Sequence, residues 1–278
     1  MEYTLRRLDK SNIPSVAHLL LGEERQELKY DSAMGGIAAF CEGVGVGTLL
    51  FVQVGRVLAV QSVKVSPAFQ KNGIGSGMLR AVCEIARQGN LLLSMAFSAA
   101  GLTAPSYRLV AASGLSVRRQ TGFTAEISRK ALEDSFLRSQ QLLQGESQRF
   151  FSLGPACRHE FSNRIRPSWP NVASRLRYGT RCFDAASSCV EQGGKIKAAS
   201  LISWDGGLPQ ISFLYADAGC GRMAMTALAH SVSRLLESES FDTLSVTVTN
   251  APSAGILNKL CGDYEIKERL YTAYDTGL

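Results

Sequence analysis

Two hydrophobic patterns alternate along the N-terminal part of the chain. Runs rich in Val, Leu and Ile are typical of strands, and apolar positions three and four residues apart are typical of a helix face. Pro105 and Gly114 are placed as residues at the start and just past the end of a helix often are. We therefore expect strands at 3–8, 56–65 and 91–97, a hairpin at 35–41 and 46–54, and helices at 13–21, after 78 and at 104–112.

The C-terminal part repeats this order. Thr103-Ala104-Pro105-Ser106 recurs as Asn250-Ala251-Pro252-Ser253 at an offset of 147, and Gly73-Ile74-Gly75 recurs as Gly219-Cys220-Gly221 at an offset of 146. Strands at 211–216 and 243–248 and a helix at 223–236 are predicted around them. Self-similarity at a fixed spacing indicates a repeated unit. We predict two similar domains, 1–135 and 150–278, joined by a linker at 136–149.

Composition restricts the class of protein. Hydrophobic residues make up 45% of the chain and charged residues 19%, which excludes a disordered chain or a collagen-like fibre. The longest apolar stretch, 91–104, is shorter than the about 20 residues that span a bilayer, and the N-terminus does not resemble a secretory signal. We expect a cytoplasmic protein with no membrane contact.

Cysteine and histidine give no sign of a metal site. The seven cysteines form no Cys-x-x-Cys pair, and the three histidines are far apart in the sequence. This pattern disfavours both zinc and a disulfide scaffold. We expect no metal and no redox cofactor.

The net charge of +6 is concentrated in one segment. Between Arg149 and Arg181 there are seven arginines and one acid, so the remainder of the chain is formally neutral. Such an excess can attract an acidic partner, although a run of charges is more often a solvated face. An acidic protein partner at Arg149–Arg181 stays open, and we do not expect a nucleic acid partner.

The most specific segment connects the strand at 56–65 to the next helix through glycines at 73, 75 and 77. Glycines let the backbone approach a ligand closely, and the start of a helix presents unpaired N–H groups at the positive end of its dipole. The segment therefore predicts a phosphate site. The glycine spacing differs from the Gly-x-Gly-x-x-Gly of dinucleotide folds, and the Gly-Lys-Ser or Gly-Lys-Thr of a P-loop is absent.

This segment resembles the acyl-coenzyme A loop of the GNAT acetyltransferase superfamily, whose pattern is Gln or Arg, two residues, Gly, one residue, Gly or Ala. Here the pattern is Gln70-Lys71-Asn72-Gly73-Ile74-Gly75. The resemblance implies an α/β (α+β) fold of tandem acyl-CoA N-acyltransferase-like domains, each a mixed, mainly antiparallel sheet flanked by helices. It also implies acetyl-CoA, or another acyl-CoA, as the co-substrate, and acetyl transfer to an amine of a small molecule or peptide by direct attack. A glycine turn that merely joins strand to helix is disfavoured by the strand-loop-helix context.

The resemblance also implies roles for individual residues. N–H groups in the loop would hold the pyrophosphate, and Gln70 would brace the loop. The N–H groups of Val63 and Val65 would pair with the pantetheine arm as an added strand does, and a strand N–H would stabilise negative charge on the thioester oxygen. The cofactor-binding residues implied in this way are Val63, Val65, Gln70, Lys71, Asn72, Gly73, Ile74, Gly75 and Ser76.

The residues for proton transfer depart from the family pattern. The family often carries a Glu on the strand before the loop and a Tyr four residues before the Gly of the later helix, but Gln61 and Val110 stand there. Tyr107 lies on nearly the same helix face as Val110 and is the candidate acid for the leaving thiolate, although it could equally pack at the helix start. The candidates for the base, which the sequence does not rank, are Glu27, Asp31 and Glu42.

The second copy differs where the loop should act. At an offset of 146, Gln70 becomes Ala216 and Lys71 becomes Asp217. A carboxylate at that position would repel a pyrophosphate, so we predict a degenerate C-terminal copy. Acylation of a hydroxyl group and the use of longer acyl chains are alternatives within the same chemistry. The missing Glu and Tyr also keep open a non-catalytic coenzyme A-binding module that engages an acidic partner through Arg149–Arg181.

Overall fold

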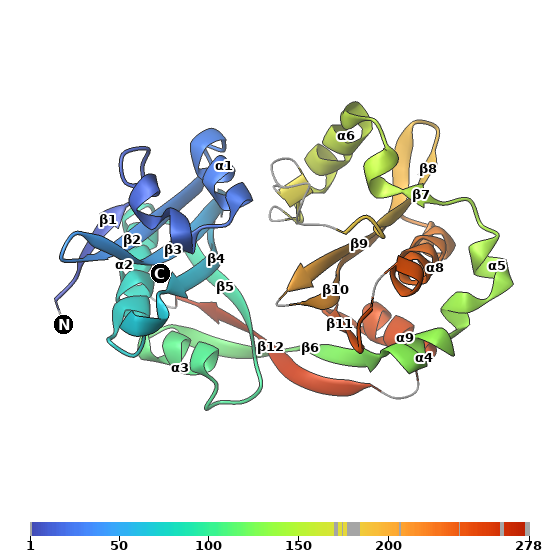
Figure 1. Ribbon diagram of the computed structural model, residues 1–278. Helices are drawn as coiled ribbons and strands as arrows, with labels where there is room; N and C mark the ends of the chain where they lie inside the picture. The colour runs from blue at the N-terminus through green and yellow to red at the C-terminus, as the bar shows by residue number, and fades with distance from the viewer. Residues whose placement is uncertain are drawn as a thin grey trace. The chain divides into compact units, whose positions relative to one another are not determined.

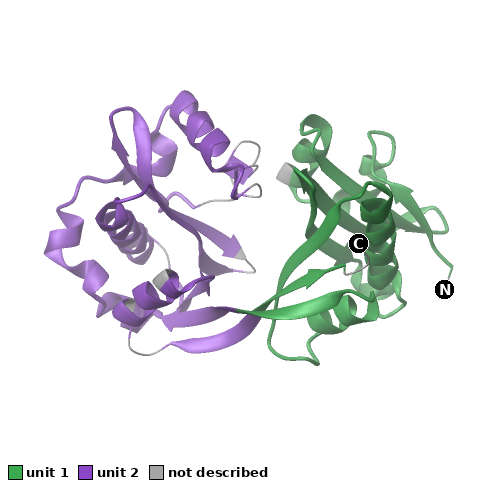
Figure 2. Ribbon diagram, turned by 180° about the vertical axis from the view of Figure 1, so that it is seen from behind, with its two compact units in different colours: residues 1–120, 270–278 green, residues 121–269 purple. Residues whose placement is uncertain are grey.

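The computed structural model describes residues 2–169, 172–173, 175–176, 184–205, 207–238, 240–261 and 264–275. The chain forms two compact units (Figure 2). Unit 1 contains Met1–Gln120 and Leu270–Leu278, and unit 2 contains Thr121–Arg269. The domains predicted at 1–135 and 150–278 are continuous along the chain and remain a prediction. Unit 1 is not continuous, because the last residues of the chain belong to it.

The sheet of unit 1 has seven strands in the order β1-β2-β3-β4-β5-β12-β6 (Figure 1). Only the first part of β6, up to residue 120, and the last part of β12, from residue 270, belong to this unit. Neighbouring strands from β1 to β4 are antiparallel, and β4 and β5 are parallel. The elements are β1 (Thr4–Arg7), η1 (Ile13–Leu19), α1 (Gly22–Tyr30), β2 (Met34–Cys41), β3 (Val44–Val54), β4 (Val57–Val65), η2 (Pro67–Phe69), α2 (Ile74–Gln88), β5 (Leu92–Ala99), α3 (Pro105–Ala112), β6 (Ser116–Ser128) and β12 (Glu265–Tyr274).

Both faces of the unit 1 sheet are covered. The apolar face of α2, including Met78 and Val82, is fully buried against Leu49 and other residues of the same core cluster. On the opposite face, Val16 of η1 is buried with Leu50 in a second cluster. The alternation of apolar residues along β3 therefore supplies both cores, because successive side chains point to opposite faces of a sheet.

The strands and helices predicted in the N-terminal part are present, with one difference. The segment expected as a helix at 13–21 is the 3-10 helix η1, in which Ser15 N–H donates to the Asn12 carbonyl at 3.1 Å. The Asn12 side chain does not cap it, because its Oδ1 accepts instead from Asp9 N–H at 3.0 Å. The α-helical segment in this region is α1, which begins at Gly22.

The strands of unit 2 follow in the order β7-β8-β9-β10-β11-β6-β12, in which β7 to β11 take the places that β1 to β5 have in unit 1. In unit 1, β12 lies between β5 and β6, and in unit 2, β6 lies between β11 and β12, so β6 and β12 exchange places. The further elements are α4 (Arg129–Glu133), η3 (Phe136–Arg138), α5 (Gln140–Leu143), β7 (Gln148–Arg149), η4 (Phe150–Ser152), α6 (Pro155–Ile165), β8 (Ser188–Gln192), β9 (Lys195–Asp205), β10 (Leu208–Ala216), α8 (Gly221–Ser238), β11 (Thr243–Val248) and α9 (Ala251–Leu260).

The core of unit 2 repeats the plan of unit 1. The long helix α8 buries one apolar side, including Leu228, Val232 and Leu235, in a cluster that also contains Ile211 of β10 and Leu244 of β11. The strands and the helix predicted around the repeated glycines therefore occur in the predicted order. Among the helices of the described residues, none combines the length and apolar character needed to cross a bilayer.

Candidate functional site

The loop between β4 and α2 has an unusual backbone. Eight residues (66–73) connect the end of β4 to the start of α2, and they include the single turn η2. The first of them, Ser66, donates its N–H to the Val46 carbonyl at 2.9 Å. Lys71 and Gly73 have φ values of 64° and 77°, in the left-handed region. A Cβ added at Gly73 would meet no atom within 4 Å. The loop therefore turns tightly into α2 and leaves open space beside Gly73.

The N–H groups at the end of this loop and in the first turn of α2 are unpaired among the described residues. Among the described residues, no hydrogen-bond acceptor contacts the N–H groups of the six residues 71–76, and the first helical bond of α2 runs from Gly77 N–H to the Gly73 carbonyl at 2.9 Å. Lys71, Asn72 and Gly73 are exposed. Unpaired N–H groups at a helix start, together with the positive end of the helix dipole, favour an anion. The loop can therefore hold a phosphate group with its main chain.

Side chains around the loop bond to its carbonyl oxygens. Gln70 Nε2 donates to the Val65 carbonyl at 3.1 Å, Asn72 Nδ2 to the Gln70 carbonyl at 3.2 Å, and Ser76 Oγ to the Gly73 carbonyl at 3.0 Å. The Tyr3 hydroxyl also lies 3.4 Å from the Gly73 carbonyl. Because these bonds take up acceptors, they fix the shape of the loop without blocking its donors.

Among the described residues, no strand pairs with the last part of β4 on the edge that faces β5. The parallel pairing of β4 with β5 runs from Val57↔Leu92 to Val60↔Met95 and does not continue beyond Val60. Hydrogen-bonded pairs alternate along an antiparallel ladder. Since Ser66 N–H bonds to β3, the N–H and carbonyl groups of Val65 and Val63 point toward the free edge. An extended ligand can therefore add to β4 at these two residues.

The family position for a strand acid lies in a bulge. In the pairing of β3 with β4, Leu50 lies opposite Ser62 and Phe51 lies opposite Val60, so Gln61 is the extra residue. The Gln61 side-chain amide donates to the Ala59 carbonyl at 3.2 Å. A neutral amide at this point cannot act as a base, which agrees with the departure seen in the sequence.

Tyr107 lies in the first turns of α3 and belongs to an aromatic cluster. Its ring centroid lies 6.2 Å from that of Phe97 and 5.3 Å from that of Tyr271, and Phe97 and Tyr271 stack at 5.4 Å. The Tyr107 hydroxyl has no hydrogen-bond partner among the described residues. Val110, which holds the strict family position, is fully buried in the core. Tyr107 therefore has a packed ring and an available hydroxyl.

The three carboxylates expected as base candidates lie in different environments. Glu42 is exposed in the β2–β3 turn with a φ of 50°. Asp31 caps the end of α1, and its carboxylate accepts from Ala33 N–H at 3.0 Å. Glu27 of α1 is buried, with 7% of its surface exposed. Glu27 belongs to α1, which contacts β4 through Glu24, and Asp31 directly follows α1, whereas Glu42 belongs to a hairpin turn.

A fourth carboxylate, Glu24, has a position that the sequence interpretation missed. It accepts from Lys64 Nζ at 2.8 Å and from Ser62 Oγ at 3.2 Å, which ties α1 to the face of β4 opposite α2. It also accepts from Leu21 N–H at 2.7 Å. A Glu three residues after a helix N-cap is a known capping signal, and this spacing could have indicated the start of α1.

The matching loop of unit 2 is shorter. β10 ends at Ala216 and α8 begins at Gly221, which leaves four residues (217–220). Asp217 N–H donates to the Lys197 carbonyl at 2.8 Å, as Ser66 N–H does to Val46, so Asp217 corresponds to Ser66. Its expected equivalence with Lys71 is wrong, because an offset of 146 fits the helices but not the strands. The carboxylate therefore follows directly on the strand end.

Asp217 is held by its own unit. Its Oδ1 accepts from Arg164 Nη1 at 2.7 Å and from the Tyr215 hydroxyl at 2.6 Å, and its Oδ2 lies 3.2 Å from Lys197 Nζ. Burial acts to raise the pKa of Asp217, but the hydrogen bonds from Tyr215 and Lys197 and the charge of Arg164 outweigh it and hold the pKa below its usual value. The charge of this carboxylate is therefore neutralised locally.

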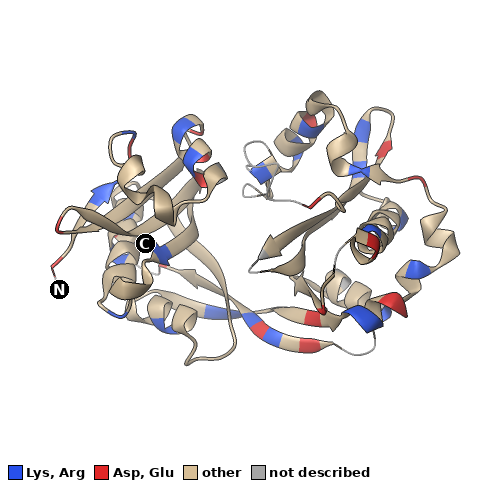
Figure 3. Cartoon of the chain, in the orientation of Figure 1, with Lys and Arg blue, Asp and Glu red and all other residues tan. Residues whose placement is uncertain are grey.

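The arginine-rich segment is partly used inside unit 2. Arg164 pairs with Asp217 and Glu160 and lies over the rings of Phe161 and Tyr215, and the Arg158 guanidinium lies over the Phe151 ring at 5.8 Å. Charges of both signs occur on α6 (Figure 3). Arg177 and Arg181 lie outside the described residues. A continuous basic face for an acidic partner remains a prediction.

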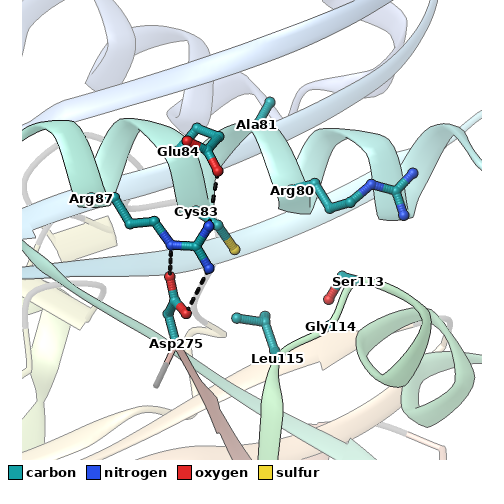
Figure 4. Close-up of a pocket in the computed structure, with 9 residues that line it drawn as sticks. All are labelled: Arg80, Ala81, Cys83, Glu84, Arg87, Ser113, Gly114, Leu115 and Asp275. Atoms are coloured by element: carbon teal, nitrogen blue, oxygen red, sulfur yellow. Dashed lines mark hydrogen bonds and ion pairs between the residues drawn. The ribbon is translucent and has the colours of Figure 1, made fainter. Parts of the chain in front are cut away.

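A cavity of about 410 Å³ lies elsewhere on unit 1. It lies beside the middle and end of α2, the end of α3 and Asp275 (Figure 4). Its α2 residues begin with Arg80, six residues or about 9 Å along the helix from Ile74. The cavity is therefore distinct from the glycine loop. Within the described ranges, no group of three or more His, Cys, Asp or Glu side chains is arranged to hold a metal ion.

Comparisons with known proteins agree with this geometry. Residues 4–109, from β1 into α3, match the acetyltransferase (GNAT) family. This range includes the whole glycine loop and Tyr107. No curated protein matches the sequence significantly.

Solved structures match the whole chain at low sequence identity. A tandem GNAT protein from the clavulanic acid biosynthesis pathway is 15% identical over 98% of both chains, with a TM-score of 0.62. A GCN5-related N-acetyltransferase from Sphaerobacter thermophilus is 13% identical over 98% of this chain and 95% of its own, with a TM-score of 0.53. A GCN5-related N-acetyltransferase from Kribbella flavida is 14% identical over 98% of this chain and 71% of its own, with a TM-score of 0.54. The chain thus has the fold of tandem GNAT proteins, and its residues 4–109 match the acetyltransferase (GNAT) family.

Proposed function

We propose that unit 1 binds acetyl-CoA, or another acyl-CoA, and transfers the acyl group to an amine of a small molecule or peptide. One observation carries this proposal: in the part of the chain that the structure describes, the N–H groups of residues 71–76 have no acceptor, while the side chains around them bond to carbonyl oxygens. A diphosphate supplies the missing acceptors. The family match to residues 4–109 supports the same class of co-substrate.

The free edge of β4 supports a position for the pantetheine arm. The amide groups of the pantetheine arm would pair with Val65 and Val63, because the N–H and carbonyl groups of these two residues point away from β3. The thioester carbonyl would then lie near the end of β4, where a strand N–H can stabilise the charge that develops on its oxygen. Gln70 assists by fixing the Val65 carbonyl at 3.1 Å.

The reaction proposed is direct attack. The amine nitrogen forms a bond to the acyl carbon, the carbon–sulfur bond breaks, and the amine gives up one proton while the thiolate takes one. A free alkyl amine with a pKa of about 10 must lose its proton before or during attack. Tyr107 has an available hydroxyl and is the proposed donor to the thiolate. Glu27 of α1 and Asp31, which directly follows α1, are the proposed acceptors of the amine proton.

The decisive experiment measures acetyl-CoA turnover with a panel of acceptors. The panel includes polyamines, amino acids, aminoglycosides and peptides, together with hydroxyl compounds of similar size, and acetylated product is detected by mass spectrometry. We expect product from at least one amine and none from the matched hydroxyl compound. Acetylation of hydroxyl compounds alone would change the acceptor class. Coenzyme A binding with no transfer to any acceptor would favour the non-catalytic module instead.

A further inference from the structure

The last strand of the chain is an integral part of unit 1. Ala273 of β12 is fully buried in the same core cluster as Met78 and Val82 of α2. Thr272 Oγ1 accepts from Gln120 Nε2 at 2.9 Å. The family match ends at residue 109, so it does not include this strand. The core of unit 1 therefore includes residues that lie about 150 positions further along the chain than the rest of the unit.

An ion pair holds the end of this strand. Arg87 of α2 forms a two-pronged pair with Asp275, at 2.8 Å from Nε and 3.0 Å from Nη2, and also contacts Glu84 at 2.9 Å (Figure 4). The hydrogen bond and charge of Asp275 raise the pKa of Arg87. Two parallel bonds restrict orientation as well as distance. The two bonds fix the position of Asp275 against α2, and Asp275 lies only four residues after Tyr271.

Tyr271 places its ring in the cluster with Tyr107. It is 92% buried, stacks on Phe97 at 5.4 Å and 20°, and meets the Tyr107 ring edge-on at 5.3 Å and 75°. Phe97 alone contacts Tyr107 less closely, at 6.2 Å. Edge-to-face contact is a preferred arrangement of aromatic rings. The Tyr107 ring therefore owes its closest aromatic contact to the far end of the chain.

We infer that Tyr271 is a positioning residue for Tyr107, so that the C-terminal strand of the chain completes the candidate active site of unit 1. This inference rests on the proposed function. The contact that matters is the ring of Tyr271, because the ring touches Tyr107 while the Tyr271 hydroxyl has no partner among the described residues. A proton donor works only within a narrow range of positions. Loss of the Tyr271 ring therefore lowers kcat through Tyr107.

The first test compares three variants. Tyr271→Leu should lower kcat about tenfold with little change in the KM for acetyl-CoA, because the phosphate loop is untouched. Tyr271→Phe keeps the ring and should retain kcat within about twofold. Tyr274→Leu is the matched control, because Tyr274 lies on the same strand but is 38% exposed. If Tyr271→Leu does not fold, Tyr271→Met replaces it.

A double-mutant cycle separates positioning from general damage. In a Tyr107→Phe background, Tyr271→Leu should cause little further loss of kcat, since its effect passes through the missing hydroxyl. An equal tenfold loss in both backgrounds would overturn the inference. So would a Tyr271→Phe variant as slow as Tyr107→Phe, because the Tyr271 hydroxyl would then act directly.

A spectroscopic readout keeps the inference testable without turnover. In protein labelled with 3-fluorotyrosine, the ¹⁹F resonance that disappears in Tyr107→Phe belongs to Tyr107. This resonance should shift or broaden in Tyr271→Leu and stay in place in Tyr274→Leu. An unchanged resonance would reject the positioning role even if the wild-type protein transfers acetyl groups. A shifted resonance with no transfer would reject only the proposed function.

Discussion

The strand-to-helix loops of the two units have the same place in the fold but different lengths. Unit 1 has eight residues between β4 and α2, and unit 2 has four between β10 and α8. The longer loop contains an extra turn and two residues with left-handed backbone. Within the described ranges, the N–H groups of 71–76, at its end and in the first turn of α2, have no acceptor. In the shorter loop, Cys220 N–H already donates to the Asp217 carbonyl at 2.9 Å. The N–H groups of residues 218, 219 and 221–223 have no acceptor among the described residues either. The two loops therefore differ in length and backbone shape more than in the number of free main-chain donors.

Ionic contacts beside the two loops are reversed. In unit 1 the acid is on the helix, since Glu24 of α1 pairs with Lys64 of β4, whereas in unit 2 the base is on the helix, since Arg164 of α6 pairs with Asp217. At an offset of 147, Tyr107 also corresponds to Ala254. The second unit thus has the same strand order, but its loop is four residues long and an alanine stands at the position of Tyr107.

The largest expected effect comes from a carboxylate in the loop of unit 1. Gly73→Asp places a negative charge in the open space beside the free N–H groups. Repulsion of about 4 kcal/mol between charges 4 Å apart at an effective dielectric constant near 20 would raise the Kd for coenzyme A at least a hundredfold. Isothermal titration calorimetry measures this change directly.

Two matched variants decide the cause. Gly73→Asn has nearly the same size and tolerates a positive φ, so it should cost less than tenfold in affinity. Gly219→Asp makes the same change in unit 2, where φ is 78° and the space is also open, and should leave the Kd within twofold. Loss of binding in Gly219→Asp with normal binding in Gly73→Asp would place the site in unit 2.

Much of the loop could be predicted because its constraints are local. The order of glycines after a strand of Val and Leu, followed by an amphipathic helix, predicts a turn and a helix start from Gln70 to Ser76. In the structure, residues 70–73 end the loop and residues 74–76 form the first turn of α2. The free N–H groups follow from helix geometry, which needs no information from distant residues.

The partners of Tyr107 could not be predicted in this way. Tyr271 is separated from it by 164 positions and reaches it only because β12 is exchanged into the sheet of unit 1. In β12 the apolar residues are interrupted by Glu265, Lys267 and Glu268, so the strand signal is weak. The true correspondence of Asp217 was also hidden, since a four-residue difference in loop length shifts the strands relative to the helices.

A smaller effect is expected from the carboxylate of unit 2. Asp217→Asn removes the counter-charge of Lys197 and one of the two carboxylates that pair with Arg164. It should lower the free energy of unfolding by about 1–2 kcal/mol at pH 7. The folded pKa of Asp217 lies below its usual value. Its stabilisation is therefore complete above about pH 4 and is lost as the pH falls through the folded pKa. The gap between wild type and variant should narrow at pH 3.

Urea unfolding followed by tryptophan fluorescence reports on unit 2, because Trp169 and Trp204, the two tryptophans of the chain, both belong to it. Coenzyme A affinity serves as the control and should change by less than twofold in Asp217→Asn. A gap that stays constant from pH 7 to pH 3 would show that the charge of Asp217 is not what stabilises the loop. A large loss of coenzyme A affinity would instead indicate that unit 2 binds the cofactor.

The smallest effect concerns the brace of the unit 1 loop. Gln70→Leu removes the hydrogen bond to the Val65 carbonyl but adds no charge. A single neutral hydrogen bond contributes about 1 kcal/mol, so the Kd for coenzyme A should rise about fivefold. Gln53→Leu is the control, because the Gln53 amide caps the Gly55 carbonyl at 3.3 Å in a turn of the same unit. If both variants weaken binding equally, general loosening of unit 1 explains the loss. A fivefold change confined to Gln70→Leu means that the shape of the loop, which differs between unit 1 and unit 2, contributes to coenzyme A affinity.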